Sequence, residues 1–190
     1  MRRLLISLLA LAALALPVAA QTAAPALDPA NTAILELKNG KVTIQLRPDL
    51  APQHVARVKQ LMKEGFYNGQ KFHRVIPEFM AQTGDPTGTG AGGSKYPDLK
   101  AEFSATEQYR RGTIGAARTS SPDSANSQFF ICFSDFGCDT LQGKYTIWGK
   151  VVLGMQWVDA ITPGQPPSTP DTIIRMYLAS DGPSAVPAKK

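Results

Sequence analysis

One arginine in this sequence lies inside an apolar stretch that also carries aromatic and amide side chains. The segment 72–85 reads FHRVIPEFMAQTGD, and strand alternation at its start places Phe72, Arg74 and Ile76 on one face. An arginine is costly on an apolar face unless its guanidinium finds hydrogen-bond acceptors, which Gln82 and backbone carbonyls could supply. Two interpretations stay open: a surface arginine on an edge strand, or a preorganised cation beside an apolar pocket.

A second segment carries small, amide and aromatic residues of the same kind. It reads GAAR at 115–118 and NSQFFI at 126–131. The chain has no phosphate-binding P-loop pattern, no nucleophile elbow and no histidine pair at metal-ligand spacing. Its histidines are His54 and His73, and His54 is expected to be an exposed polar residue in the first turn of a helix. The chemistry indicated is one that needs neither a nucleophile nor a metal.

The glycine-rich run 88–93 matches the G-x-G-x-x-G pattern of dinucleotide-binding folds by letter. That pattern binds a pyrophosphate only where it opens a helix. The residues that follow, SKYP, do not start a helix. We therefore expect a flexible loop at 88–93 and no dinucleotide cofactor.

Short strands bounded by turn residues must position these segments. Asn39-Gly40 between two alternating runs predicts a hairpin, and apolar residues at helical spacing predict helices over 52–64 and 155–161. The predicted strands span 32–38, 41–46, 71–76, 79–82, 113–118, 128–133, 145–152 and 172–178. This pattern favours an all-β fold, an antiparallel sheet closed into a barrel with the two helices over its open ends.

Three ordered blocks of the chain resemble the cyclophilin family of peptidyl-prolyl cis-trans isomerases. The segment 72–85 is similar to the family signature FHRVIPxFMxQxGD, 127–131 matches its SQFFI block, and 141–149 resembles the block before its last long strand. The resemblance covers 32–178. It implies a closed eight-stranded antiparallel barrel capped by two α-helices, which agrees with the fold expected from periodicity.

The resemblance also implies site residues. Arg74, Gln82 and Phe79 are expected to be catalytic, with Gln82 orienting the Arg74 guanidinium. The proline pocket and the peptide contacts are expected from Phe79, Met80, Ala117, Arg118, Gln128, Phe130, Leu141 and Tyr145. Thr140 stands where many members carry a tryptophan that helps bind cyclosporin, so tight cyclosporin binding is not expected.

The implied reaction is rotation about X–Pro peptide bonds, which requires no cofactor and no metal because no covalent bond is made or broken. The expected substrates are X–Pro-containing polypeptides, in particular unfolded exported proteins. The alternative is a non-catalytic cyclophilin-like chaperone or binding module for proline-containing segments.

The first twenty residues have the pattern of a secretory signal. Arg2 and Arg3 precede the apolar run 4–16, and small residues end at Ala20. Cleavage there predicts a periplasmic or secreted protein; an uncleaved membrane anchor is the alternative. The remaining chain reads as a leader at 21–30, one domain at 31–178 and a flexible tail at 179–190.

Loss of Arg2 and Arg3 with the signal lowers the formal charge from +5 to +3, which does not favour nucleic-acid binding. We expect a monomer without stable membrane insertion. Cys132 and Cys138 could form a disulfide in an oxidising compartment or remain two inert thiols.

Overall fold

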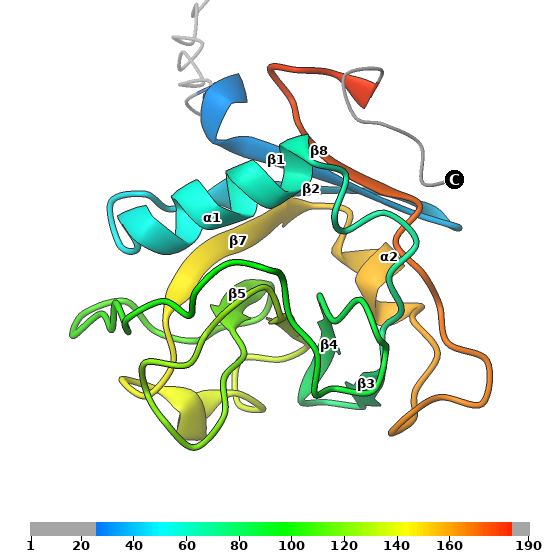
Figure 1. The fold of residues 1–190 in the computed structure, drawn as a ribbon. Coiled ribbons are helices and arrows are strands. Elements are labelled where there is room, and N and C mark those ends of the chain that lie inside the picture. Colours follow the sequence, from blue (N-terminus) through cyan, green and yellow to red (C-terminus); the bar gives the residue numbers. More distant parts are fainter. Residues whose placement is uncertain (1–25, 184–190) are drawn as a thin grey trace, which may run out of the picture.

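The computed structural model describes residues 26–183, which Figure 1 shows as a curled sheet with helices packed against it. The signal predicted at 1–20, and parts of the predicted leader and tail, lie outside these residues. The strands are β1 (Thr32–Leu37), β2 (Gly40–Leu46), β3 (Arg74–Ile76), β4 (Met80–Thr83), β5 (Thr113–Ala116), β6 (Phe129–Cys132), β7 (Ile147–Leu153) and β8 (Arg175–Leu178). The helices are α1 (Pro52–Lys63) and α2 (Met155–Asp159), with short 3-10 helices η1 (Pro29–Asn31) and η2 (Asp139–Leu141). Every predicted strand and helix is confirmed, most with shorter bounds.

The eight strands form one antiparallel sheet in the order β3-β4-β6-β5-β7-β2-β1-β8. The predicted hairpin is confirmed, because β1 pairs with β2 up to Leu37 and Gly40. Strands that are far apart along the chain, such as β4 and β6, are thereby brought side by side. This half of the sheet carries the two segments singled out in the sequence.

The sheet is open, so the prediction of a closed barrel is wrong in this respect. The edge strands β3 and β8 share no ladder; isolated bridges join Lys71 to Thr172 and Val75 to Gly164. The segment 163–170, which faces β3, contains four prolines. Proline has no N–H to donate to a ladder, so regular pairing does not extend along this edge.

The main core lies between the sheet and α1, which contacts β7 and β8 (Figure 1). Phe129 packs edge to face against both Trp148 and Tyr67, with ring centroids 5.3 and 5.6 Å apart. The apolar side chains of α1, among them Val55 and Leu61, are buried in the same core. Within 26–183, no helix combines the length and the apolar character needed to cross a bilayer.

A carboxylate from a distant loop caps the start of α1. Ala51, the N-cap residue, offers no side-chain acceptor, and Glu102 accepts instead from the backbone N–H groups of Gln53 and His54, each at 3.0 Å. The His54 ring lies against the same carboxylate, with Nδ1 2.6 Å from Oε2. His54 is only 3% exposed, so the expectation of an exposed histidine is wrong: its ring takes part in the capping.

A second, smaller apolar cluster lies on the other half of the sheet and leads to the site. Its buried members are Met80, Tyr109, Phe130, Cys132, Cys138 and Ile147. Partly buried side chains pack against it, among them Phe79, Leu141 and Tyr145. These include most of the residues expected to form the proline pocket.

Candidate active site

Nine of the ten expected site residues line one cavity of about 100 Å³. They are Arg74, Phe79, Met80, Gln82, Ala117, Arg118, Phe130, Leu141 and Tyr145. The tenth, Gln128, lies next to the cavity, where its Oε1 accepts a hydrogen bond from Gln82 Nε2 at 2.9 Å. The fold thus brings all ten residues together at one place.

Strand register places the polar and apolar parts of the site in one row. Arg74 lies opposite Gln82 in the β3–β4 ladder, and Gln82 lies opposite Phe130 in the β4–β6 ladder. Residues directly opposite one another point to the same face of a sheet. Gly115 follows next in the row, opposite Phe130, and a Cβ there would lie 2.3 Å from the Phe130 ring. The absence of that Cβ leaves room for the ring under the cavity.

The alternation of faces predicted for the start of segment 72–85 holds only within β3. Arg74 faces the cavity, and Ile76 packs against the same cluster. Phe72 precedes the strand and is buried in the main core, so its predicted place on the Arg74 face is wrong. The backbone before β3 bonds to the 171–173 segment instead, with Phe72 N–H donating to the Asp171 carbonyl at 2.9 Å.

The Arg74 guanidinium is held by two amide oxygens and lies near an aromatic face. Nε donates to Gln165 Oε1 at 3.1 Å, and Nη1 lies 3.4 Å from Gln82 Oε1. The centre of the guanidinium is 5.8 Å from the centroid of the Phe79 ring. No carboxylate within 26–183 forms an ion pair with Arg74, so its charge remains available to a ligand. Sequence reasoning missed Gln165, for which no local pattern gives a signal.

Aromatic rings form the far wall of the cavity. Phe130 stacks on Tyr109 and meets Tyr145 edge to face, each with a centroid distance of 5.8 Å. Arg118 covers the outer face of Tyr145, with its guanidinium carbon 4.3 Å from the ring centroid. Its Nη2 donates to the Lys144 carbonyl at 2.9 Å, which holds the side chain along the rim. The wall is therefore apolar inside and cationic at its edge.

A second cavity of about 510 Å³ adjoins the first. It shares Gln82, Ala117 and Arg118 with it and is otherwise lined by polar residues and by the backbone of 90–94. Gln128 also lines this second cavity. A chain bound across the site would meet an apolar cavity and then a polar one.

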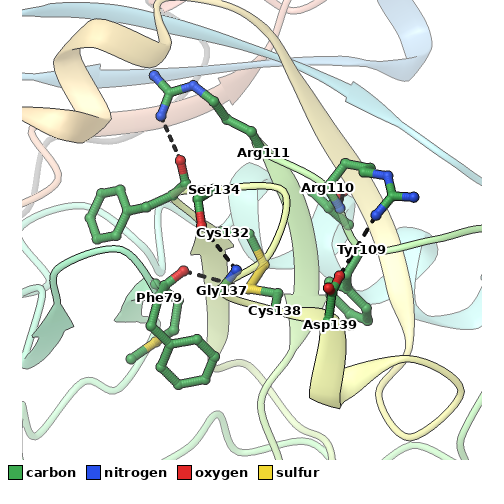
Figure 2. The surroundings of a disulfide bond; sticks show 12 residues. Phe79, Tyr109, Arg110, Arg111, Cys132, Ser134, Gly137, Cys138 and Asp139 are labelled. Atoms are coloured by element: carbon green, nitrogen blue, oxygen red, sulfur yellow. Dashed lines mark hydrogen bonds and ion pairs between the residues drawn. A yellow bond between two sulfur atoms is a disulfide. The ribbon is translucent and has the colours of Figure 1, made fainter.

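A disulfide lies behind the apolar wall. Cys132 and Cys138 are bonded, which settles the alternative left open by the sequence, and both are fully buried. Figure 2 shows Phe79 beside this bond, and the Cys138 sulfur lies 3.5 Å from the Phe79 carbonyl oxygen. The Leu141 N–H donates to the Cys138 carbonyl at 2.9 Å. The disulfide thus connects β6 to the backbone of Phe79 and Leu141, two residues that line the cavity.

The residues that line the cavity define the interactions it offers to a ligand. Within 26–183, no group of three or more His, Cys, Asp or Glu side chains is placed to hold a metal ion. What the cavity offers is exclusion of water by Phe79, Met80, Phe130 and Leu141, together with a cationic donor, Arg74, at its edge. Thr140 does not line it.

Comparison with known proteins gives one consistent result. A family model described as "Cyclophilin type peptidyl-prolyl cis-trans isomerase/CLD" matches residues 32–178. A "Probable peptidyl-prolyl cis-trans isomerase" from Brucella suis is 51% identical over 191 aligned positions, which cover 92% of this chain and 96% of that protein. A peptidyl-prolyl cis-trans isomerase from Helicobacter pylori is 42% identical over 120 residues, 63% of this chain and 72% of that protein.

Solved structures agree with the sequence comparison. A cyclophilin from Hirschia baltica superposes with a TM-score of 0.73 at 28% identity, over 83% of this chain and 77% of that one. A cyclophilin-type isomerase from Cryptosporidium parvum, crystallised in the presence of the dipeptide Ala-Pro, gives a TM-score of 0.72 at 28% identity, over 77% of this chain and 98% of that one.

Proposed function

This chain belongs to the cyclophilin family and is a cyclophilin-type peptidyl-prolyl cis-trans isomerase, and we propose that it rotates X–Pro bonds in the cavity beside Arg74. The observation that carries this proposal is the meeting of a guanidinium that has no ion-pair partner within 26–183 with a cavity lined by Phe79, Met80, Phe130 and Leu141. The proline ring occupies the apolar cavity, and the peptide bond before it lies at the edge, within reach of Arg74.

The activation barrier of the uncatalysed reaction sets how far the site must lower it. Rotation breaks amide resonance and crosses a barrier of roughly 18–20 kcal/mol, which takes on the order of tens to hundreds of seconds without a catalyst. Reaching milliseconds needs four to five powers of ten, about 5.5–7 kcal/mol. No single contact of this cavity supplies that much.

Three effects share the work. The planar amide is more polar than the twisted one, so transfer into the apolar cavity favours the twisted form. Arg74 donates to the prolyl nitrogen, which accepts a hydrogen bond once it is twisted out of resonance; a charged donor contributes roughly 1.5–3 kcal/mol. The remainder comes from binding the twisted peptide better than either planar isomer, with Gln82 fixing the guanidinium and Ala117, Arg118, Gln128 and Tyr145 holding the flanking chain.

The substrates we propose are X–Pro segments of exported polypeptides that have not yet folded. The support is twofold: residues 1–20 have the pattern of a cleavable secretory signal, and disulfides such as Cys132–Cys138 persist in oxidising compartments. The protein then works as a monomer in the periplasm or outside the cell. Its small apolar cavity accepts a proline side chain from an extended segment, so the substrate does not need to be folded.

The site is tested on the chain from Gln21 onward by an isomerisation assay on an Ala-Pro peptide, combined with an NMR titration of the same peptide. We expect faster isomerisation and shifts centred on Ala117, Phe130 and Tyr145. A third cavity, of about 350 Å³, lies around Val75, Arg111 and Asp159, and shifts centred there would contradict the assignment. Binding of the peptide without faster isomerisation would instead favour the alternative, a non-catalytic chaperone or binding module.

Export is tested separately with the full chain carrying a C-terminal tag in a Gram-negative bacterium. We expect the tagged protein in the periplasm or the medium, with Gln21 as its first residue. Retention in the cytosol, or a membrane-bound form that keeps residues 1–20, would contradict the proposed location without affecting the proposed site.

A further inference from the structure

The glycine-rich run 88–93 is wrapped around a buried carboxylate. Asp85 is 1% exposed, and its two oxygens accept from four backbone N–H groups of the following loop. Oδ1 accepts from Thr87 N at 2.7 Å; Oδ2 accepts from Thr89 N at 3.0, Gly90 N at 2.6 and Gly92 N at 3.2 Å. The Thr87 hydroxyl adds a further bond at 2.8 Å. The loop expected to be flexible is thus anchored at one point.

The glycines serve this wrapping. At Gly92 a Cβ would lie 2.2 Å from Asp85 Oδ1, and Gly88 and Gly90 have φ values of 70° and 89°. Other residues would block the carboxylate or strain the backbone. The N–H groups of Thr89, Gly90 and Gly92 are bonded to Asp85 and are therefore not free to bind a pyrophosphate.

With its N–H groups turned inward, the loop presents two carbonyls to Gln128. Nε2 of Gln128 donates to Gly90 O at 2.9 Å and to Gly92 O at 2.8 Å. Carbonyls only accept, so this end of the Gln128 amide must be its NH₂ group. Its oxygen is therefore the end that faces Gln82.

The requirement that each donor faces an acceptor also fixes the orientation of the Gln82 amide beside Arg74. Gln128 Oε1 accepts from Gln82 Nε2 at 2.9 Å, which leaves Gln82 Oε1 as the end that faces the guanidinium, 3.4 Å from Nη1. A guanidinium has donors and no acceptor. If either amide were reversed, an NH₂ group would face a donor at one of these contacts. The carbonyls of the loop therefore determine which end of each amide group, in Gln128 and then in Gln82, faces its neighbour.

We infer that Asp85 is a positioning residue for the isomerase reaction, acting through the Gly90 and Gly92 carbonyls, Gln128 and Gln82 to keep an acceptor aimed at Arg74. This inference rests on the proposed function of Arg74. Asp85 itself lines neither cavity, and the bonded route from its loop to the Arg74 guanidinium runs through the two amides.

The test replaces the carboxylate by an amide of equal size. Asp85→Asn turns one acceptor oxygen into a donor that faces the loop N–H groups, so the carbonyls of the loop lose their fixed positions. We expect kcat on an Ala-Pro peptide to fall by about fivefold, the value of one ordinary hydrogen bond, with a smaller change in KM. Glu36→Gln is the matched control: Glu36 is also a buried carboxylate, on β1, and its loss is expected to lower the melting temperature but not kcat.

A double-mutant cycle separates positioning from general stability. In the Gln128→Ala background, Asp85→Asn should have little further effect on kcat, because the route to Arg74 is already cut. The side-chain NH₂ signals of Gln82 should shift in Asp85→Asn and stay in place in Glu36→Gln. If Asp85→Asn does not fold, Thr87→Val takes its place in the same cycle; it removes the hydroxyl bonds of Thr87 to Asp85 and Thr89 and keeps the backbone N–H bonds to the carboxylate.

Three outcomes would overturn the inference: an unchanged kcat in the folded variant, a full additional loss on top of Gln128→Ala, or unmoved Gln82 signals. Failure of the proposed function looks different. In that case Arg74→Ala itself leaves kcat unchanged, whereas failure of this inference alone leaves Arg74→Ala impaired and Asp85→Asn active.

Discussion

Arg74 and Gln82 lie directly opposite each other in the β3–β4 ladder, with Nη1 of the arginine 3.4 Å from Oε1 of the glutamine. The pairing is set by the backbone, so the guanidinium keeps its place without a carboxylate partner. Its full charge is retained at the edge of an apolar cavity.

Arg74→Ala should lower kcat/KM on an X–Pro peptide by tenfold or more. The charged donor to the prolyl nitrogen contributes roughly 1.5–3 kcal/mol, which corresponds to one to two powers of ten in rate. Arg74 is half-buried at the cavity edge, and we expect the circular dichroism spectrum and the melting temperature to change little. Arg74→Lys retains the charge but not the fixed planar array of guanidinium donors, and its kcat/KM should lie between those of Arg74→Ala and the unchanged protein. Equal turnover in Arg74→Ala and the unchanged protein would remove this residue from the mechanism.

Phe130→Ala should weaken the binding of proline peptides by about tenfold, because an aromatic floor of the cavity is lost. Phe130 is 4% exposed, so the same change opens a void and costs about 3–5 kcal/mol of stability. Phe130→Leu fills most of that void and separates the two effects. Peptide affinity is measured by calorimetry at a temperature where both variants are folded, and an unaltered affinity would contradict the pocket assignment.

Local sequence patterns predicted the elements that depend on neighbours in the chain. Asn39-Gly40 placed the first hairpin, and the spacing of Val55, Val58 and Met62 placed α1. The grouping of Arg74, Gln82 and Phe130 followed from the resemblance to a family, and the strand register now gives its physical basis.

The features that the sequence did not predict are contacts between distant segments. Gln165 reaches Arg74 across 91 residues, and Glu102 caps a helix that begins about fifty residues earlier. Neither residue type is unusual where it stands, so nothing local marks it. The open edge of the sheet depends in the same way on how the proline-rich segment 163–170 packs against β3.

Glu102→Gln should lower the free energy of unfolding by about 1–2 kcal/mol, the usual value of a helix cap. The carboxylate accepts from the N–H groups of Gln53 and His54, and the neutral amide is a weaker acceptor with one donor end that clashes with them. Urea unfolding measures the change. Because Glu102 is absent from the cavity wall, kcat/KM should stay the same, and a loss of activity at full folding would show that the cap serves the site.

Stability should fall as the pH is lowered from 7.5 to 5.5. Burial lowers the pKa of His54, and the nearby Glu102 carboxylate only partly offsets this; burial also lowers the pKa of His73. In the unfolded chain both rings take up a proton near pH 6.5, before they do so in the folded protein. The unfolded state therefore binds more protons in this window and is favoured as the pH falls.

The check is urea unfolding at both pH values for the unchanged protein and for His54→Asn, which keeps a donor for Glu102. The variant should lose less stability between pH 7.5 and 5.5 than the unchanged protein. The carboxyls held by hydrogen bonds, such as Asp85, have lowered pKa values and titrate below this window. A stability that rises toward pH 5.5 would contradict the assignment of neutral, buried rings.

Removal of the disulfide by Cys132→Ala with Cys138→Ala should lower the free energy of unfolding by about 2 kcal/mol, the value for so short a closed loop. The bond also backs the wall residues Phe79 and Leu141, so KM for a proline peptide should rise while kcat changes less. Both sulfurs are fully buried, which leaves a reductant no access to the folded protein. Dithiothreitol alone should therefore leave activity intact, and dithiothreitol with urea, followed by refolding under reducing conditions, should reproduce the double variant.

Two results would contradict this account. Rapid reduction in the native state would show that the segment 133–137 opens readily. An unchanged KM in the reduced, refolded protein would show that the crosslink stabilises the fold without shaping the cavity.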